Sequence, residues 1–322
     1  MASTTRTEIA REVNNFYDRT LLERVVPRFL YQKFAQVRDL PKNPGTNTIK
    51  FRRYGNLTAA TTPLSEGITP LGSQGSITDI TATVSQYGDY VTITDVVDYE
   101  SIDPVLTEYA QILGDQSSDT LDQITRDVLL AGTSVIYAGT AVARNQVGAS
   151  DLITATMIKK AVRLLKNNNA RKITEMIGPN PNIATTPLNA CFVGICHPNT
   201  GYTLKDLTGW IPVEKYPAQK MIMEGEIGAL DEVRFIETTN SKVFSASGSG
   251  GIDVYGTVIL AANAYGTSRI SGQSLKNIIK PLGSGGSADP LDQRQTSGWK
   301  ATFTAKILNN NFLTRLEHAV AA

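Results

Sequence analysis

The sequence has few of the residues that metal, disulfide and thiol chemistry require. Only two cysteines and two histidines occur among its 322 residues, so the chain cannot build a disulfide framework or several metal sites. It has no run of 18 apolar residues and no apolar segment close to Met1, so we expect no membrane partner and no signal peptide. The sequence therefore predicts a chain that is made and used in a reducing compartment.

An excess of either charge sign is also missing. Thirty-one basic residues nearly balance 30 acidic ones, for a net charge of +1, which disfavours a dedicated nucleic-acid-binding protein. The charges are nevertheless segregated along the chain: residues 79–127 carry eleven acids and one base, whereas 42–54 and 159–172 carry bases alone. These blocks are either solvated faces or complementary surfaces between subunits.

Short catalytic motifs are absent as well. The sequence has no G-x-S-x-G, no Gly-Lys dipeptide and no H-E-x-x-H, which argues against a nucleophile elbow, a Walker A loop and a zincin. Gly283, Gly285 and Ala288 fit G-x-G-x-x-A. The motif ends in a turn signal, Asp289-Pro290, and no βαβ pattern surrounds it, so we expect no dinucleotide site.

One short segment, Cys191 to His197, resembles a metal or thiol cluster. Residues five apart on a strand point to opposite faces, so the thiols of Cys191 and Cys196 are expected to diverge. We therefore predict no catalytic, metal or cofactor site and no enzymatic activity. An enzyme with an unfamiliar site is the distant alternative, and convergent titratable groups in a pocket would indicate it.

The first hundred residues predict segments that cannot bury themselves. Residues 1–40 have helical apolar spacing interrupted at Pro27, which indicates either an amphipathic arm of two short helices or the first layer of a core. Strand-like alternation at Ile49 and Phe51 and again from Ile77 to Val97 flanks a polar tip. Isolated two-stranded ribbons are marginal in water, so this extended hairpin must lie on something else.

A long helix and a compact α/β unit follow. Asp103 is a suitable N-cap, Pro104 suits the first helical position, and apolar spacing continues to 131, which predicts a helix about 42 Å long. Its polar middle indicates one face that is solvated or meets another chain. In 151–269 we expect a helix over 154–167 and strands at 191–196, 233–236 and 254–262. A strand at 299–307 and a short helix at 312–320 are expected to close the chain.

This order of parts, together with short motifs, resembles the major capsid proteins of tailed bacteriophages, which share their shell fold (the Johnson fold) with herpesviruses. The resemblance spans essentially the whole chain, and its motifs are Tyr216, Glu224-Gly225-Glu226-Ile227-Gly228, Val233-Arg234-Phe235-Ile236-Glu237, Tyr255-Gly256, Ala264-Tyr265-Gly266, Asp289-Pro290-Leu291, Gly298-Trp299-Lys300 and Arg315-Leu316-Glu317. Each motif is weak alone, but their order and spacing are fairly specific.

The resemblance implies an α+β fold with five parts. They are an N-terminal arm at 1–40, an extended loop at 41–100 that reaches over a neighbouring subunit, a peripheral domain with a spine helix at 101–150, an axial domain at 151–269, and a return to the peripheral domain at 270–322. It also implies a function: self-assembly, as hexamers and pentamers, into the icosahedral head that encloses packaged double-stranded DNA. Another structural phage protein, such as a tail-tube or decoration protein, is the alternative.

The resemblance further implies partners. Because the chain begins at Met1 with no long preceding segment, we expect a separate scaffolding protein rather than a cleaved internal one. A portal is a further expected partner, whereas the sequence does not decide whether a decoration protein is one, and contact with packaged DNA should be weak and independent of sequence. For the contact between subunits, we expect the loop bases Lys50, Arg52 and Arg53 to face acids of an adjacent copy, namely Asp115, Asp119 or Asp122.

Overall fold

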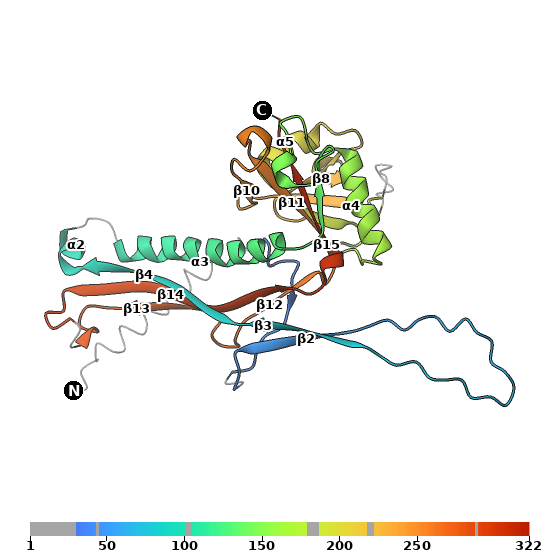
Figure 1. Cartoon of the computed structure of the whole chain (residues 1–322). Helices are drawn as coiled ribbons and strands as arrows, with labels where there is room; N and C mark the ends of the chain where they lie inside the picture. Colours follow the sequence, from blue (N-terminus) through green and yellow to red (C-terminus); the bar gives the residue numbers. More distant parts are fainter. Residues whose placement is uncertain are drawn as a thin grey trace.

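The protein is described by a computed structural model over residues 30–42, 45–100, 105–178, 187–217, 222–286 and 289–321. Most of the expected arm, at 1–29, and the expected helix cap at Asp103-Pro104 lie outside these residues. Figure 1 shows an elongated layer of helix and sheet, a compact lobe at one end of the helix, and a ribbon that projects past the lobe. The mixed α+β class expected from the sequence is confirmed.

The elongated layer is built on one helix, α3 (Val105–Leu130), which confirms the long helix predicted over 104–131. It lies along the sheet formed by β4 (Ser85–Thr94), β13 (Leu275–Lys280) and the long strand β14 (Arg294–Ile307). Leu113 and Leu121 pack on Trp299 and Phe303. The alternation predicted for 299–307 is therefore confirmed as a strand whose one face is covered by α3.

The polar middle of α3 is partly inside the molecule. Ser117 and Ser118 are buried, and both hydroxyls donate hydrogen bonds to the Gly114 carbonyl, at 2.8 and 3.1 Å. Such bonds to a carbonyl three or four residues earlier satisfy a buried hydroxyl within the helix. Only part of the polar middle is thus left for solvent or for another chain.

The ribbon is the extended hairpin expected from the sequence. β2 (Thr48–Tyr54) pairs antiparallel with β3 (Ile77–Thr83), which continues through Val84 into β4. Every residue of the tip, 55–76, is exposed. The prediction of strand at Val96 and Val97 is wrong, because both residues lie in α2 (Asp95–Glu100), where the Asp95 carboxylate accepts the Val96 N–H at 2.9 Å.

The last residues of the expected arm belong to the core. Tyr31 is 1% exposed and packs with Leu30 and Phe34 in the cluster around Tyr265. β1 (Gln36–Val37) adds to the sheet of the elongated layer through parallel pairing with β12 (Tyr265–Ser268). Of the two interpretations of 1–40, the first layer of a core therefore holds for residues 30–40.

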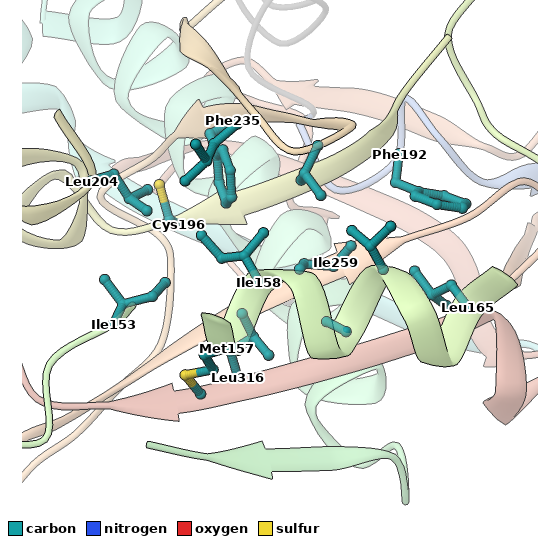
Figure 2. Packing of buried hydrophobic residues seen from close by; sticks show 14 of the residues in the cluster. Ile153, Met157, Ile158, Leu165, Phe192, Cys196, Leu204, Phe235, Ile259 and Leu316 are labelled. Atoms are coloured by element: carbon teal, nitrogen blue, oxygen red, sulfur yellow. The ribbon is translucent and has the colours of Figure 1, made fainter. Parts of the chain in front are cut away.

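The compact lobe contains an eight-stranded sheet covered by α4 (Ala155–Asn167). Thr154 caps α4 by accepting the Met157 N–H at 3.3 Å, and Figure 2 shows its apolar face against Phe192 and Phe235. Leu164, expected in that face, is 38% exposed instead. In sheet order the strands are β5 (Val135–Tyr137), β15 (Leu313–His318), β11 (Val254–Leu260), β6 (Phe192–Cys196), β9 (Val233–Glu237), β8 (Glu226–Leu230) and β7 (Ile211–Pro212), with β10 (Val243–Phe244) beside β11.

The lobe is completed by one more helix, α5 (Pro198–Lys205), which follows β6 and is capped by His197. The two cysteines near this strand are free and buried. Cys196 packs in the core under α4, and Cys191 packs in a separate cluster with Tyr216. The expectation that their thiols diverge is thus confirmed.

The helix predicted at 312–320 is wrong. Residues 313–318 form β15, a fully buried strand between β5 and β11. The prediction failed because the charged residues Arg315 and Glu317 suggest the solvent-exposed face of a helix. In the structure Glu317 is 0% exposed and forms ion pairs with Arg144 and Arg315, both at 2.7 Å. β15 therefore joins the sheet of the compact lobe and does not return to the layer of β14. The limits of the five named domains stay a prediction.

His318 in β15 predicts acid sensitivity. Its Nε2 lies 3.0 Å from Thr257 Oγ1, and complete burial lowers its pKa to about 4. Because the unfolded chain binds this proton more tightly, stability is full above pH 6.5 and falls as the pH drops towards 4, by about 2–3 kcal/mol at pH 4.5. Urea unfolding of the isolated chain at pH 7 and 4.5 should show this loss, and His318→Gln should lose less. An equal loss in both proteins would contradict this role.

Candidate assembly interface

The bases expected at the interface lie on the ribbon. Side chains alternate along β2, so Lys50 and Arg52 point to one face and Arg53 to the other, and all three are exposed. Arg52 Nε lies 3.9 Å from Asp79 Oδ1 directly across the ribbon. This exposed pair is worth little, so the three bases keep most of their capacity for a partner.

Among the described residues, the ribbon contacts the body at its base. A Cβ added to Gly266 in β12 would lie 3.2 Å from Phe51 Cε1. The first residues of β2 therefore pack closely against the body. The groove at this junction is lined by Ile49, Phe51, Ile80, Leu308 and Phe312 together with the ribbon bases. Beyond it, residues 55–76 are all exposed within the part of the chain that the structure describes, and Figure 1 shows them projecting away from the body.

Two of the three acids expected opposite these bases lie on the outward side of α3. Asp115 and Asp119 are half-buried and line a shallow groove along the helix, together with Asp127. Asp119 also accepts a weak hydrogen bond from Asn240 Nδ2 at 3.4 Å. The groove thus presents carboxylates to a partner, and contact with the ribbon of another copy stays a prediction for both acids.

Asp122, the third expected acid, faces the interior of the molecule, so its carboxylate is not accessible to another copy. It is 1% exposed, and its carboxylate accepts the Tyr31 N–H at 2.9 Å and the Asn240 Nδ2 at 3.2 Å. Burial raises the pKa of this carboxyl above its usual range. Asp122 lies one helical turn after Ser118, on the buried face of α3 that packs against Tyr31. The sequence pattern does not indicate this orientation.

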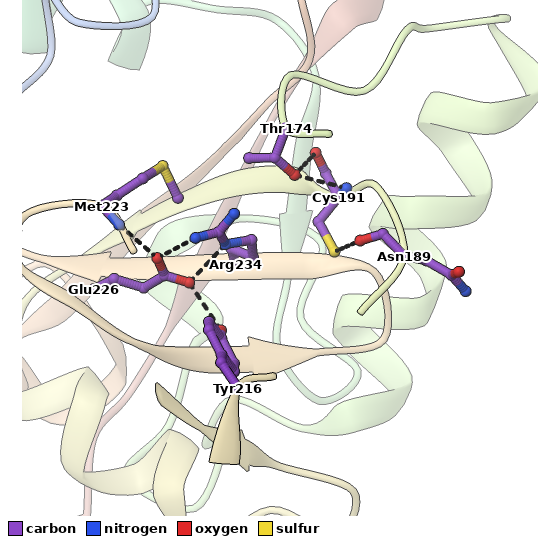
Figure 3. Close-up of polar contacts among 7 residues, drawn as sticks. All are labelled: Thr174, Asn189, Cys191, Tyr216, Met223, Glu226 and Arg234. Carbon is purple, nitrogen blue, oxygen red and sulfur yellow. Dashed lines mark hydrogen bonds and ion pairs between the residues drawn. The ribbon is translucent and has the colours of Figure 1, made fainter. Parts of the chain in front are cut away.

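The compact lobe contains a buried charge network that is not among the features expected from the sequence. Figure 3 shows Glu226 on β8 held by Arg234 on β9, with distances of 2.6 Å from Nε to Oε1 and 2.5 Å from Nη2 to Oε2. The Tyr216 hydroxyl and the Met223 N–H also donate to this carboxylate, at 2.8 and 2.9 Å. The sequence does contain a signal for this network. Arg234 is a basic residue within an otherwise apolar strand segment, and a buried base requires an acid beside it.

The carboxylate at the centre of this network is surrounded by hydrogen-bond donors. Glu226 already accepts four hydrogen bonds, so the network fixes the β8–β9 hairpin. Within the described residues, no cluster of three or more His, Cys, Asp or Glu side chains could hold a metal ion. The helices of the same part of the chain include none long and apolar enough to cross a membrane.

Comparisons with known proteins give one partial relative. No protein-family profile matches the chain. Over 137 residues, the chain is 31% identical to the major capsid protein of Pseudomonas phage KPP21, a match that covers 41% of this chain and 34% of that protein. The match therefore spans about a third of the length of this curated relative.

Solved structures resemble the chain over nearly its whole length. The capsid of Ralstonia phage GP4 superposes with a TM-score of 0.68 at 11% identity, over 90% of this chain and 88% of that one. The capsid of cyanophage P-SCSP1u gives a TM-score of 0.62 at 15% identity, over 89% and 87%. The elongated layer, the ribbon and the compact lobe together therefore make up the shell fold of phage capsid proteins, and this chain has that fold.

Proposed function

We propose that the chain is a major capsid protein that self-assembles, as hexamers and pentamers, into the icosahedral head around packaged double-stranded DNA. The observation that carries this proposal is the ribbon. Its tip exposes Leu57, Leu64, Ile68 and Leu71, each more than 60% accessible, although nothing in the described body covers them. Apolar side chains gathered on a projecting segment mark a site of protein contact. The capsid fold and the partial relative support the same conclusion.

The proposal includes a location and further partners. The chain would reside in the virion, with a separate scaffolding protein and a portal during assembly and possible attachment of a decoration protein to the finished head. Contact with packaged DNA would be weak, because a net charge of +1 offers little phosphate neutralisation. We assign the chain no catalytic role, since Glu226 and Glu317, the most deeply buried carboxylates of the described lobe, are both held by arginines.

Imaging separates this proposal from its alternative. A tail-tube protein would form rings that stack into tubes, and a decoration protein would form small particles. Negative-stain electron microscopy of the purified chain, alone and expressed together with the neighbouring genes of its source, should show closed shells. Tubes, or small particles of uniform size under both conditions, would contradict the proposal. The long α3 packed on a twisted sheet already favours a shell subunit over a mostly β tube subunit.

Charge reversal on the ribbon tests the proposed contact with α3. Arg52→Glu with Arg53→Glu should block shell formation and leave the soluble chain folded, because both side chains are exposed. Adding Asp115→Arg and Asp119→Arg should restore shells if the two surfaces meet between copies. Normal shells from the first variant, measured by sedimentation, would show that these bases stay solvated, where each pair is worth about 0–1 kcal/mol.

A further inference from the structure

The helix α4 carries its bases on the side that faces away from the core of the compact lobe. Met157, Ile158 and Leu165 point into that core, as Figure 2 shows. Because each residue turns a helix by about 100°, six exposed positions on the opposite side share an arc of about 120°. We call this surface the α4 basic face, and it consists of Thr156, Lys159, Lys160, Arg163, Lys166 and Asn167.

The charge around this face is positive. Between Asp151 and Glu175 the sequence has six bases and no acid. The fold brings Glu232, in the turn between β8 and β9, up to the end of α4, where Lys166 and Lys172 each bind it at 2.8 Å. Two bases thus neutralise one acid, so this contact leaves an excess of positive charge beside the α4 basic face.

The α4 basic face offers hydrogen-bond donors, and none of its six residues is apolar. Leu164, at its border, is 38% exposed. Contacts between proteins usually centre on aromatic and aliphatic side chains that become buried. Contacts with nucleic-acid phosphates are made by Arg, Lys, Asn and Thr side chains, which are the residue types of this face. Its composition therefore favours a phosphate backbone as the occupant.

The length of this face suits a DNA duplex. Lys159, Arg163 and Asn167 follow one another at intervals of four residues, and the rise along the helix between the first and the last is about 12 Å. Double-stranded DNA carries one charge for about each 1.7 Å of its axis. A duplex beside α4 therefore presents several phosphates to these side chains, and Figure 1 shows α4 on the outside of the compact lobe.

Two other groups of exposed bases suit DNA less well. On the ribbon, Arg52 lies 3.9 Å from the acid Asp79, which would repel phosphate. On the sheet of the elongated layer, Lys276 lies opposite Lys300. Ile278, on the same side of β13 as Lys276, is 43% exposed. These surfaces mix bases with an acid or an apolar side chain, which is typical of contacts between proteins.

We propose that the α4 basic face contacts the phosphate backbone of packaged double-stranded DNA. This inference rests on the proposed function and names the surface of the subunit that receives the DNA. Lys159, Lys160 and Arg163 pair with phosphate oxygens, and the Asn167 amide donates a hydrogen bond. Such a contact is weak in one subunit and independent of sequence, and its repetition over a shell adds the small contributions together.

The salt dependence of DNA binding tests the contact in the unassembled full chain. A short labelled duplex is titrated with the chain at several salt concentrations, and fluorescence anisotropy gives the binding constant K. Replacing Lys159, Lys160 and Arg163 by Gln should weaken binding at low salt at least tenfold. It should also reduce the slope of log K against log salt by about 2–3, because each phosphate contact contributes about 0.9. An unchanged slope would overturn the proposal.

A matched control removes the same charge elsewhere. Lys205→Gln, Lys215→Gln and Lys276→Gln all change exposed bases outside α4 and should leave the slope within about 0.5 of that of the unaltered chain. An equal reduction in both triple variants would show that net charge alone governs binding, which contradicts an assignment to α4. Both variants should keep the circular dichroism spectrum of the unaltered chain, because the replaced side chains are exposed.

Lysine labelling of the unaltered chain distinguishes DNA from a protein as the occupant. Lys159 and Lys160 should react with an N-hydroxysuccinimide ester in the free chain and in empty shells, and severalfold less in DNA-filled heads. Protection already in empty shells would show that a protein covers α4, and equal reactivity in filled and empty shells would show that DNA does not. Either result contradicts this inference alone, whereas absence of shells contradicts the proposed function.

Discussion

Replacing residues 55–76 with an Asn-Gly turn is expected to abolish shell assembly and leave the chain folded. Tyr54 and Ile77 are directly paired at the ends of β2 and β3, so a two-residue turn of this type closes the hairpin without distorting it. The deleted residues are all exposed and contribute no buried side chain to the body. The loss therefore falls on contacts with other copies, and sedimentation should find only small species.

The control for this deletion keeps the length of the ribbon and removes its side chains. A Gly/Ser segment of equal length in place of 55–76 should also fail to assemble, because it lacks the exposed aliphatic side chains of the tip. Both variants should show the circular dichroism spectrum and the thermal midpoint of the unaltered chain within a few degrees. Closed shells from either variant would contradict the role assigned to the tip.

Arg234→Ala is expected to destabilise the compact lobe by about 3–5 kcal/mol. Arg234 and Glu226 are 3% and 0% exposed in their side chains and are joined at 2.5 Å. Removing the guanidinium leaves a carboxylate buried without its counter-charge, and the remaining donors, Tyr216 and the Met223 N–H, do not replace it. Urea unfolding of the purified chain measures the loss.

A double-mutant cycle separates the ion pair from simple packing. Arg234→Met with Glu226→Gln removes both charges and keeps the volume, so it should be less destabilising than Arg234→Met alone. The coupling between the two positions is then favourable and large, as expected for groups in direct contact. Additive effects would show that the two side chains contribute only their bulk. In that case, the network would have no special part in fixing the β8–β9 hairpin.

The elements with a strong local signal were predictable. The apolar spacing of α3 and α4 and the alternation of β2, β3 and β14 each agree with one secondary structure, and the structure has them. The exposed tip was predictable for the same reason, because a polar stretch rich in Thr, Gly and Pro cannot bury itself. Local sequence therefore fixed the parts from which the proposed interface is made.

Where tertiary contacts decide, the sequence pattern failed. Arg315 and Glu317 suggest the solvent-exposed face of a helix. The buried strand β15 forms instead because Arg144, which is distant in the sequence, neutralises Glu317 inside the lobe. Asp122 resembles Asp115 and Asp119 in sequence, and only the approach of Tyr31 and Asn240 separates it from them. Lys276 and Lys300 likewise become cross-strand neighbours only through the register of β13 and β14, which no local pattern indicates.

Hydrogen–deuterium exchange of the tip amides compares the free chain with the assembled particle directly. If sister copies supply the surface that this segment lacks, peptides from 55–76 should exchange within seconds in the monomer and become protected in shells, while α3 stays protected in both. Slow exchange of those peptides in the monomer, or equally fast exchange in shells, would contradict that conclusion.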